Sequence, residues 1–218
     1  MNNSTQSFLL HGRGNSCIAR VRPLAFAAKA DVSIQHATEA HLAGIAEIRA
    51  AAAFEDAVFD RLAPTKMKRF ASQELARLQR TLQNQDDTNI ENQSVPGVLA
   101  SSFTLVALCG EVVVGSVDVS VASDEVILDA GFDLDGEERY YYVDNVVVRD
   151  DWRAQGVGAE MMKAVEQAVP GVLLVRVELN NVAALRLYAK AGFRGDSEGE
   201  PGGSTVGVFV MLSKKVSR

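Results

Sequence analysis

The chain has 218 residues and a formal net charge of −6 at pH 7, and hydrophobic residues make up 47% of it. This composition is that of a soluble globular protein, and no apolar run approaches the roughly 20 residues that a membrane helix needs. Cys17 and Cys109 lie far apart and the histidines lack ligand-like partners, so we expect neither a disulfide framework nor a metal site. The acidic balance also argues against nucleic acid as a partner, because its binding needs clustered cations.

The first 30 residues differ from the rest of the chain. They are rich in Ser, Asn and Ala and contain no acid, and their basic residues are Arg13, Arg20, Arg22 and Lys29. This composition is typical of an organelle transit peptide. We therefore expect residues 1–30 to be a disordered leader addressed to a plastid (chloroplast). The alternatives are a mitochondrion, or a basic tail without an address on a cytoplasmic protein. Residues 31–215 are expected to form a single domain.

The first half of that domain is predicted to contain a short strand, two helices, a polar loop and a β-hairpin about Gly110. Helical spacing of apolar residues indicates the helices, and Thr38 can cap the first of them. Two apolar runs on either side of a glycine turn indicate the hairpin. The expected ranges, in chain order, are Val32–Ile34, Thr38–Ala53, Lys66–Leu82, 83–97, and Leu99–Leu108 with Val112–Val121.

The second half is predicted to begin with an acidic loop and then to alternate strands with helices. Gly171 and Gly192 follow the two expected helices and are fitting terminators. The expected ranges are the acidic loop 123–138, strand Arg139–Val148, helix Val157–Val169, strand Val172–Leu179, helix Val182–Ala191, loop 195–204 and strand Val206–Leu212. This order predicts a mixed α/β fold.

A glycine turn joins the strand at Val148 to the following helix, with the sequence Arg153-x-x-Gly156-x-Gly158-Ala159. Helix N-termini expose N–H groups and partial positive charge, and glycines let a diphosphate approach the backbone. A Walker A loop would need a following Lys-Ser/Thr, and a dinucleotide fingerprint would need a third glycine; the sequence has neither. The turn therefore suits another diphosphate, and an ordinary β–α turn is the alternative.

This turn resembles motif A of the GNAT superfamily of N-acetyltransferases. A second stretch, Asn181-x-x-Ala184-Leu185-x-Leu187-Tyr188-x-x-x-Gly192-Phe193, is similar to motif B of that family. The resemblance implies a mostly antiparallel mixed sheet of about six to seven strands, with a splayed central strand pair and flanking helices. It also implies acetyl-CoA as the acetyl donor, with no metal. The segment Tyr142–Val148 resembles plastid members that acetylate protein lysines and N-termini.

The resemblance implies binding roles for individual residues. The main chain of Val146, Val147 and Val148 is expected to pair with the pantetheine arm. Arg153 is expected to support the turn or a phosphate. Asn181 is expected near the pantetheine, or as the cap of its helix. The expected pyrophosphate-binding residues are Ala154, Gln155, Gly156, Val157, Gly158 and Ala159.

The resemblance also implies catalytic roles. Tyr188 matches the tyrosine that protonates the departing thiolate, and the alternative is a core tyrosine. Asp144 and Tyr142 are the candidate bases, directly or through water. Strand alternation predicts that these two share one face while Val143 and Asn145 share the other. Alternatively, Asp144 caps or pairs with a loop arginine such as Arg139. Some protein-acetylating members carry a Glu or His base on the next strand, five residues before the motif B asparagine. This chain has Arg176 at that position, and Glu178, on the same face, could serve as the base instead.

The acceptor is expected to be a primary amine. The segments 123–138 and 195–204 are acidic, and an acidic rim would steer cationic amines inward. We expect protein lysines or N-termini as acceptors, with polyamines or amino acids as the alternative. An acetyl-CoA-binding adaptor without catalysis is the alternative of another class. The sequence leaves monomer and homodimer open.

Overall fold

The computed structural model describes residues 31–55, 57, 60–91, 102–132, 139–195 and 209–216, with side chains left out over 84–91. The expected leader, residues 1–30, lies outside the described residues. The elements are β1 (Val32–His36), α1 (Glu39–Ala53), α2 (Ala63–Glu91), β2 (Ser102–Cys109), β3 (Val112–Val121), α3 (Asp124–Asp129), β4 (Tyr140–Val148), a 3-10 turn η1 (Asp150–Trp152), α4 (Val157–Ala168), β5 (Gly171–Glu178), α5 (Val182–Lys190) and β6 (Phe209–Val216).

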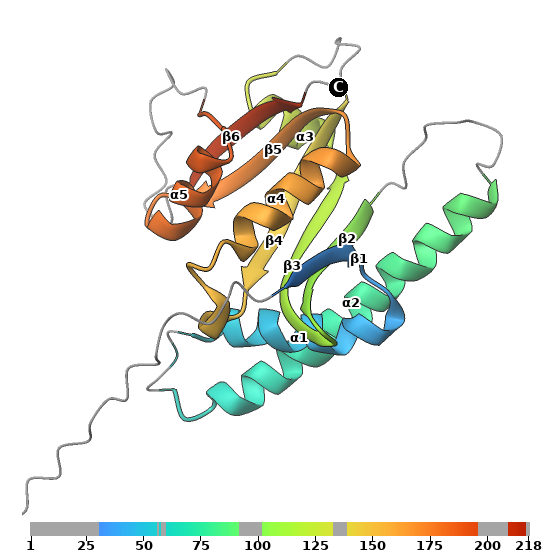
Figure 1. The fold of residues 1–218 in the computed structure, drawn as a ribbon, viewed down its shortest axis with the longest axis vertical. Coiled ribbons are helices and arrows are strands. Elements are labelled where there is room, and N and C mark those ends of the chain that lie inside the picture. Colours follow the sequence, from blue (N-terminus) through green and yellow to red (C-terminus); the bar gives the residue numbers. More distant parts are fainter. Residues whose placement is uncertain are drawn as a thin grey trace, which may run out of the picture.

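The strands form one six-stranded sheet in which their order in space equals their order in the chain (Figure 1). All neighbours are antiparallel except β4 and β5, which α4 connects as a parallel pair. That pair is joined only from Tyr140 to Tyr142 on β4 and from Val172 to Leu174 on β5. The predicted mixed sheet with a splayed central pair is therefore confirmed.

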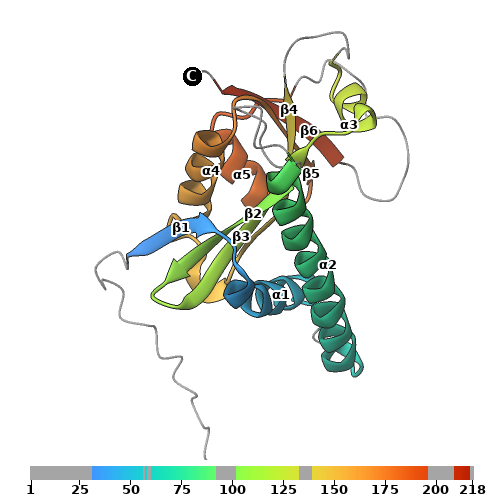
Figure 2. The same cartoon turned by 90° about the vertical axis from the view of Figure 1, so that its right-hand side faces the viewer.

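Helices cover both faces of the sheet (Figure 2). On one face, α4 inserts Met161 into a core that includes Val117 and Leu173, all fully buried. On the other face, α1 and α2 place Ile45 and Leu78 against β2. Alternating side chains of β2 and β3 supply both cores, as expected for a sheet that is buried on both sides. Thr38 caps α1 as predicted, and its N–H donates to His41 Nδ1 at 3.0 Å.

Three predicted boundaries were wrong by four residues or more. Helix α2 continues to Glu91 instead of ending at Leu82, because residues 83–91 are mostly polar but contain no glycine or proline to stop a helix. The start of the predicted acidic loop is the helix α3, which Ser123 caps by accepting from the Val126 N–H at 3.4 Å. Strand β6 reaches Val216, four residues beyond the predicted end. Lys214 and Lys215 are polar, so the hydrophobic pattern did not indicate that the strand continues through them, although they pair with β5 at the edge of the sheet.

Candidate active site

The strands β4 and β5 separate after their last pair, Tyr142 and Leu174. A bulge in β4 accompanies the separation: Asp144 pairs with Asp118 and Val147 pairs with Ser116, so two residues of β4 face one residue of β3. Asn145 adopts a left-handed φ of 50° there, a conformation that asparagine tolerates better than most residues. A bulge bends and twists its strand. The residues Val146–Val148 therefore diverge from β5, and their main chain faces an opening.

The bulge corrects one prediction from strand alternation. Val143 points into the core beneath α4, on the face opposite to Asp144. The side chain of Asn145, however, reaches the α1 and α2 side, where its Nδ2 donates to Asp118 Oδ2 at 2.9 Å. Asn145 therefore shares a face with Asp144 and with Asp118, the partner of Asp144 on β3, because the extra residue in β4 resets the two-residue period.

The turn between β4 and α4 has the geometry of an anion-binding site. Ala154 and Gly156 adopt left-handed φ values of 59° and 90°, on either side of Gln155. Such alternation turns consecutive N–H groups toward one point, and the first N–H groups of α4 have no acceptor within the helix. A Cβ on Gly156 would meet nothing within 4 Å, which leaves the turn open to a ligand. The turn therefore fits the diphosphate that the sequence predicted.

Gly158, in contrast, has a packing role in this structure. A Cβ at this position would lie 3.2 and 3.3 Å from the two δ-carbons of Leu187. The absence of a side chain thus lets α4 approach α5 closely. The predicted contact of Gly158 with a pyrophosphate stays a prediction.

Arg153 ties the glycine turn to the end of α1. Its Nη1 and Nη2 donate to the two carboxylate oxygens of Glu55 at 2.7 Å each, and its Nε donates to the Val148 carbonyl at 3.3 Å. Asp150 lies 3.5 Å from the same guanidinium. Arg153 therefore has the supporting role, the first of its two predicted roles. A contact with phosphate stays a prediction.

Helix α5 carries Tyr188 to the opening. The cap of this helix is Asn181, whose Oδ1 accepts from the Ala184 N–H at 3.0 Å, so its predicted capping role is present. The Tyr188 ring is buried, with 4% of its surface exposed, and lies edge-on to Phe193 at 5.4 Å. Among the described residues, no side chain hydrogen-bonds its hydroxyl, and the same residues include no unpaired polar atom sealed from solvent. We infer that the hydroxyl reaches solvent in the opening.

The three predicted catalytic residues lie close enough to affect one another. Burial, and then the charges of Asp144 and Tyr142, raise the pKa of Tyr188 above its ordinary value. Burial and the charge of Asp144 also raise the pKa of Tyr142, against the opposing charge of Arg176. Both tyrosines therefore keep their protons at neutral pH. Tyr188 is suited to donate a proton, and Tyr142 is a poorer base than the sequence suggested.

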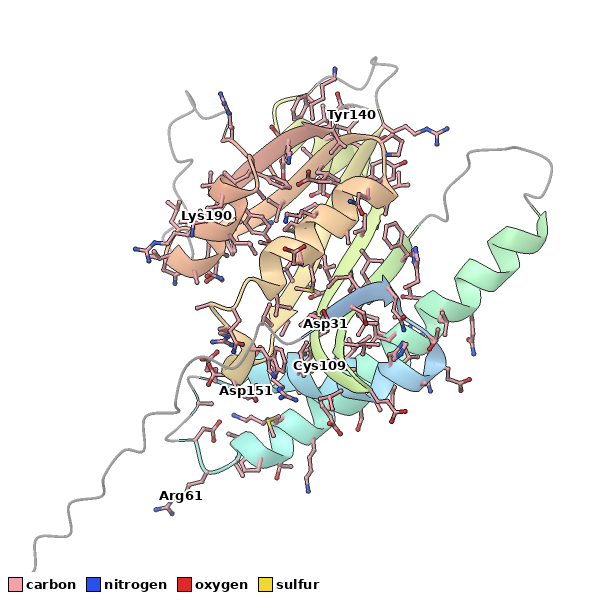
Figure 3. The ribbon with its side chains drawn as sticks, in the orientation of Figure 1. Asp31, Arg61, Cys109, Tyr140, Asp151 and Lys190 are labelled. Carbon is pink, nitrogen blue, oxygen red and sulfur yellow. The ribbon has the colours of Figure 1, made fainter. Side chains whose placement is uncertain are left out.

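Asp144 is the exposed carboxylate of this group. Its Oδ1 accepts from the Asn145 N–H at 2.7 Å. Within the part of the chain that the structure describes, no salt bridge involves Asp144, so the alternative in which it pairs with Arg139 is not observed. Tyr140 and Asp151 lie near the two ends of β4 in Figure 3, and Asp144 lies on the strand between them.

Arg176 and Glu178 are exposed on β5, on the face that Tyr142 and Leu174 share. Continuing the parallel register by two residues beyond the pair Tyr142–Leu174 places Arg176 opposite Asp144, across the opening. The Arg176 guanidinium lies 4.2 Å from the centre of the Phe209 ring. No carboxylate pairs with Arg176 among the described residues. Its donors are therefore available at the opening.

A buried polar cluster behind the bulge was missed by the sequence reasoning. Its centre is Asp118, which is bound by two arginines from α1 and α2. A signal was present: Asp118 interrupts the apolar run of β3, and Arg49 stands among the apolar positions of α1. A charge at a core position is rare unless it is paired.

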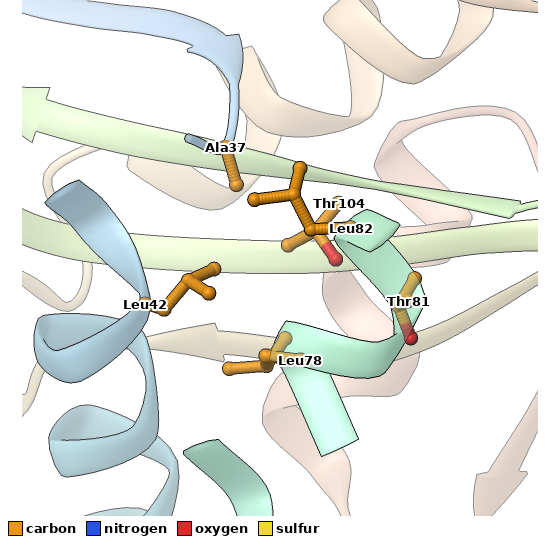
Figure 4. Close-up of a pocket in the computed structure, with 6 residues that line it drawn as sticks. All are labelled: Ala37, Leu42, Leu78, Thr81, Leu82 and Thr104. Carbon is orange, nitrogen blue, oxygen red and sulfur yellow. The ribbon is translucent and has the colours of Figure 1, made fainter. Parts of the chain in front are cut away.

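A separate small hollow lies between α1, α2 and β2 (Figure 4). It is lined by Ala37, Leu42, Leu78, Thr81, Leu82 and Thr104, and it includes none of the predicted site residues.

Over the described ranges, no helix is long and apolar enough to cross a membrane. The described side chains also contain no cluster of three or more His, Cys, Asp or Glu that could hold a metal ion.

Known proteins resemble this chain in sequence pattern and in fold. The sequence profile of the acetyltransferase (GNAT) family matches residues 68–193. No curated protein sequence matches the chain. Among solved structures, the fold is similar to that of the Salmonella typhimurium protein yncA with its cofactor acetyl-CoA (14% identity, 86% of this chain and 95% of the other, TM-score 0.53). It is also similar to the paia N-acetyltransferase from Thermoplasma acidophilum in complex with coenzyme A (10%, 85% and 99%, 0.53). A third is the ribosomal-protein-alanine N-acetyltransferase from Brucella melitensis (21%, 84% and 99%, 0.52).

Proposed function

The chain belongs to the GNAT family of acetyltransferases, and we propose that it transfers the acetyl group of acetyl-CoA to a primary amine of a protein, on a lysine side chain or an N-terminus. The observation that carries the proposal is the opening after Tyr142 and Leu174, where Tyr188 and Asp144 come together beside an anion-binding turn. Acetyl-CoA supplies an acetyl group activated as a thioester.

Binding is assigned to main-chain groups. A strand that has left its neighbour offers unpaired N–H and C=O groups, so Val146–Val148 can pair with an extended amide-containing arm. The N–H groups from Ala154 to Ala159 can hold a diphosphate. Asn181 caps α5, and this keeps Tyr188 at the opening.

Proton transfer is assigned to Tyr188 and Asp144. The acceptor is an ammonium in solution and must lose a proton before its nitrogen can attack. Asp144, exposed on the acceptor side of β4, takes this proton directly or through a water molecule. Tyr188 holds a proton at its Oη because burial and nearby negative charge raise its pKa, and it donates this proton to the leaving thiolate.

The preference for a cationic acceptor is supported by α3. This helix packs on the face of β4 that carries Tyr142, and its exposed Asp124, Glu125 and Asp129 are directed to solvent. An acidic rim raises the local concentration of cationic amines. The remaining acids of the two predicted acidic segments, in 133–138 and 196–200, lie outside the described residues.

Arg176 supports a second candidate acceptor, a free amino acid. A guanidinium opposite Asp144 could hold the carboxylate while Asp144 receives the amine. Arg176→Gln separates the two candidates. It should raise the KM of an amino-acid acceptor severalfold or more, whereas turnover of lysine and N-terminal peptides should not depend on Arg176.

The proposal is tested by CoA release from acetyl-CoA against lysine peptides, peptides with free N-termini, polyamines and free amino acids. We expect the wild-type protein to turn over the peptides and the variant Asp144→Asn to lose this activity. Turnover of polyamines or amino acids alone would contradict protein acetylation.

We further propose that residues 1–30 direct the protein to a plastid. The support is their composition, with four basic residues and no acid. A fusion of residues 1–30 to a fluorescent protein should enter plastids, and import into mitochondria alone, or a cytoplasmic signal, would contradict this.

A further inference from the structure

We propose that Asp118 is a positioning residue that holds the β4 bulge in place from behind, and so sets the orientation of Asp144 and of the open segment Val146–Val148. The proposal rests on the proposed function, which gives Asp144 and this segment their roles. Asp118 lies opposite Asp144 on the neighbouring strand, but arginines from α1 and α2 cover it and only 14% of its side chain is exposed.

The carboxylate of Asp118 accepts five hydrogen bonds from four elements, so its position is fixed. One of them comes from the bulge itself. The donors are Arg49 Nη2 at 2.9 Å and Thr104 Oγ1 at 2.6 Å to Oδ1, and Arg49 Nη1 at 2.9 Å, Arg77 Nη2 at 2.7 Å and Asn145 Nδ2 at 2.9 Å to Oδ2.

The charges of this cluster are balanced. Glu74 accepts from Arg49 Nη1 at 2.7 Å and from Arg77 Nη2 at 2.8 Å, so two arginines face two acids. Burial alone would raise the pKa of Asp118, but the hydrogen bond and charge of Arg49, with the other donors, lower its pKa below the ordinary value. Asp118 is therefore ionised, and a charged acceptor binds its donors more strongly than a neutral one.

The cluster holds β3 on both sides of the bulge. Arg49 Nε donates to Ser116 Oγ at 3.0 Å, while its two Nη atoms hold Asp118. Ser116 and Asp118 are the residues between which the β3–β4 register shifts. Arg49, a buried arginine of α1, therefore holds Ser116 and Asp118, the two β3 residues on either side of the register shift.

Asn145 connects this rigid frame to the reactive strand. Its side chain is held by Asp118, and its own N–H donates to Asp144 Oδ1 at 2.7 Å. Its left-handed φ of 50° is an unfavourable conformation that the surrounding contacts must maintain. Loss of the contact between Asn145 and Asp118 should let the bulge relax, and this would move the Asp144 carboxylate and the first residues of the open segment.

The deciding variant is Asn145→Gly, which removes the contact with Asp118 but tolerates the left-handed backbone. The matched control is Thr104→Val, which removes a different hydrogen bond to Asp118, does not touch β4 and leaves the two arginines and Asn145 to hold the carboxylate. We expect Asn145→Gly to lower kcat/KM roughly tenfold to a hundredfold and to shift the acidic limb of the pH profile. Thr104→Val should keep the wild-type pH profile and kcat.

A purely structural role would lower stability in both variants and leave the pH profile of each unchanged, and that result would overturn the proposal. Calorimetric binding of CoA provides a readout that does not depend on turnover. Asn145→Gly should weaken CoA binding and Thr104→Val should not. If the wild type binds CoA but turns over no amine, the proposed function fails, while the CoA affinities of the two variants still decide whether Asp118 positions the strand.

Discussion

The guanidinium of Arg153 and the carboxylate of Glu55 form two parallel hydrogen bonds of 2.7 Å across 98 positions of the sequence. This pair joins the glycine turn to the chain that leaves α1. Both side chains are nearly half exposed, 41% for Arg153 and 48% for Glu55. The turn proposed to bind the diphosphate is thus linked to the helix that also supplies Arg49.

Glu55→Gln should remove this link at a small cost in stability. The hydrogen bond from Arg153 lowers the pKa of Glu55 below its ordinary value of 4.5. The pair therefore stabilises the fold above that value and is lost as pH falls through the lowered pKa. An exposed pair contributes less than about 1 kcal/mol. Urea unfolding at pH 7 and low salt should show this difference, and the difference should shrink as the pH falls below 4.5 and in high salt. A difference unaffected by pH would contradict the account.

The two left-handed residues of the glycine turn predict opposite responses to exchange of alanine and glycine. Gly156→Ala should destabilise the fold by about 1 kcal/mol, because an L-residue with positive φ is strained. Ala154→Gly relieves the same strain, and the freer unfolded chain offsets part of the gain, so the variant should be neutral or slightly more stable. Thermal unfolding of the two variants measures this. Equal destabilisation by both would show that the turn is not built as described.

Tyr188→Phe should reduce kcat on the order of a hundredfold, the usual contribution of a positioned proton donor, with little change in acetyl-CoA affinity. Because burial and nearby negative charge raise its pKa above the ordinary 10.0, Tyr188 should cause no loss of activity below pH 10. Tyr141→Phe is the matched control: it removes the same hydroxyl from another buried tyrosine of the same core. Steady-state kinetics of both variants measure the loss of kcat. An equal loss of kcat in Tyr188→Phe and Tyr141→Phe would argue against a specific role of the Tyr188 hydroxyl.

The acids of α3 should affect the acceptor and not the acetyl donor. A triple variant Asp124→Asn, Glu125→Gln and Asp129→Asn removes the exposed charge beside the Tyr142 face. At low ionic strength it should raise the KM of a cationic peptide severalfold, and added salt should remove the difference. An acceptor KM that is unchanged at low salt would exclude steering by this helix.

Much of the fold was predictable because its signals are local. The hairpin about Gly110, the cap at Thr38 and the end of α5 before Gly192 each depend on a few neighbouring residues, and each is present. The length of α2 was not predictable, because polar residues without glycine or proline suit a helix and a loop equally well.

The active site was predictable in part for the same reason. The glycine turn, Asn181 and Tyr188 belong to continuous motifs. The side-chain direction of Asn145 depends on a bulge, and the Asp118 cluster depends on contacts between residues up to 69 positions apart, as between Arg49 and Asp118. No local pattern encodes such contacts, although a charge in an apolar run gives a hint that a buried partner exists.

In the proposed function, acetyl-CoA binds in the opening of β4 and is held by the main chain of that strand and of the glycine turn. Amide hydrogen–deuterium exchange, with and without saturating acetyl-CoA, decides whether these main-chain groups hold the cofactor. We expect new protection at Val146–Val148 and at Ala154–Ala159, with little change in β1 and β2. Protection confined to the hollow under α2, or no protection in either predicted segment despite measurable binding, would contradict it.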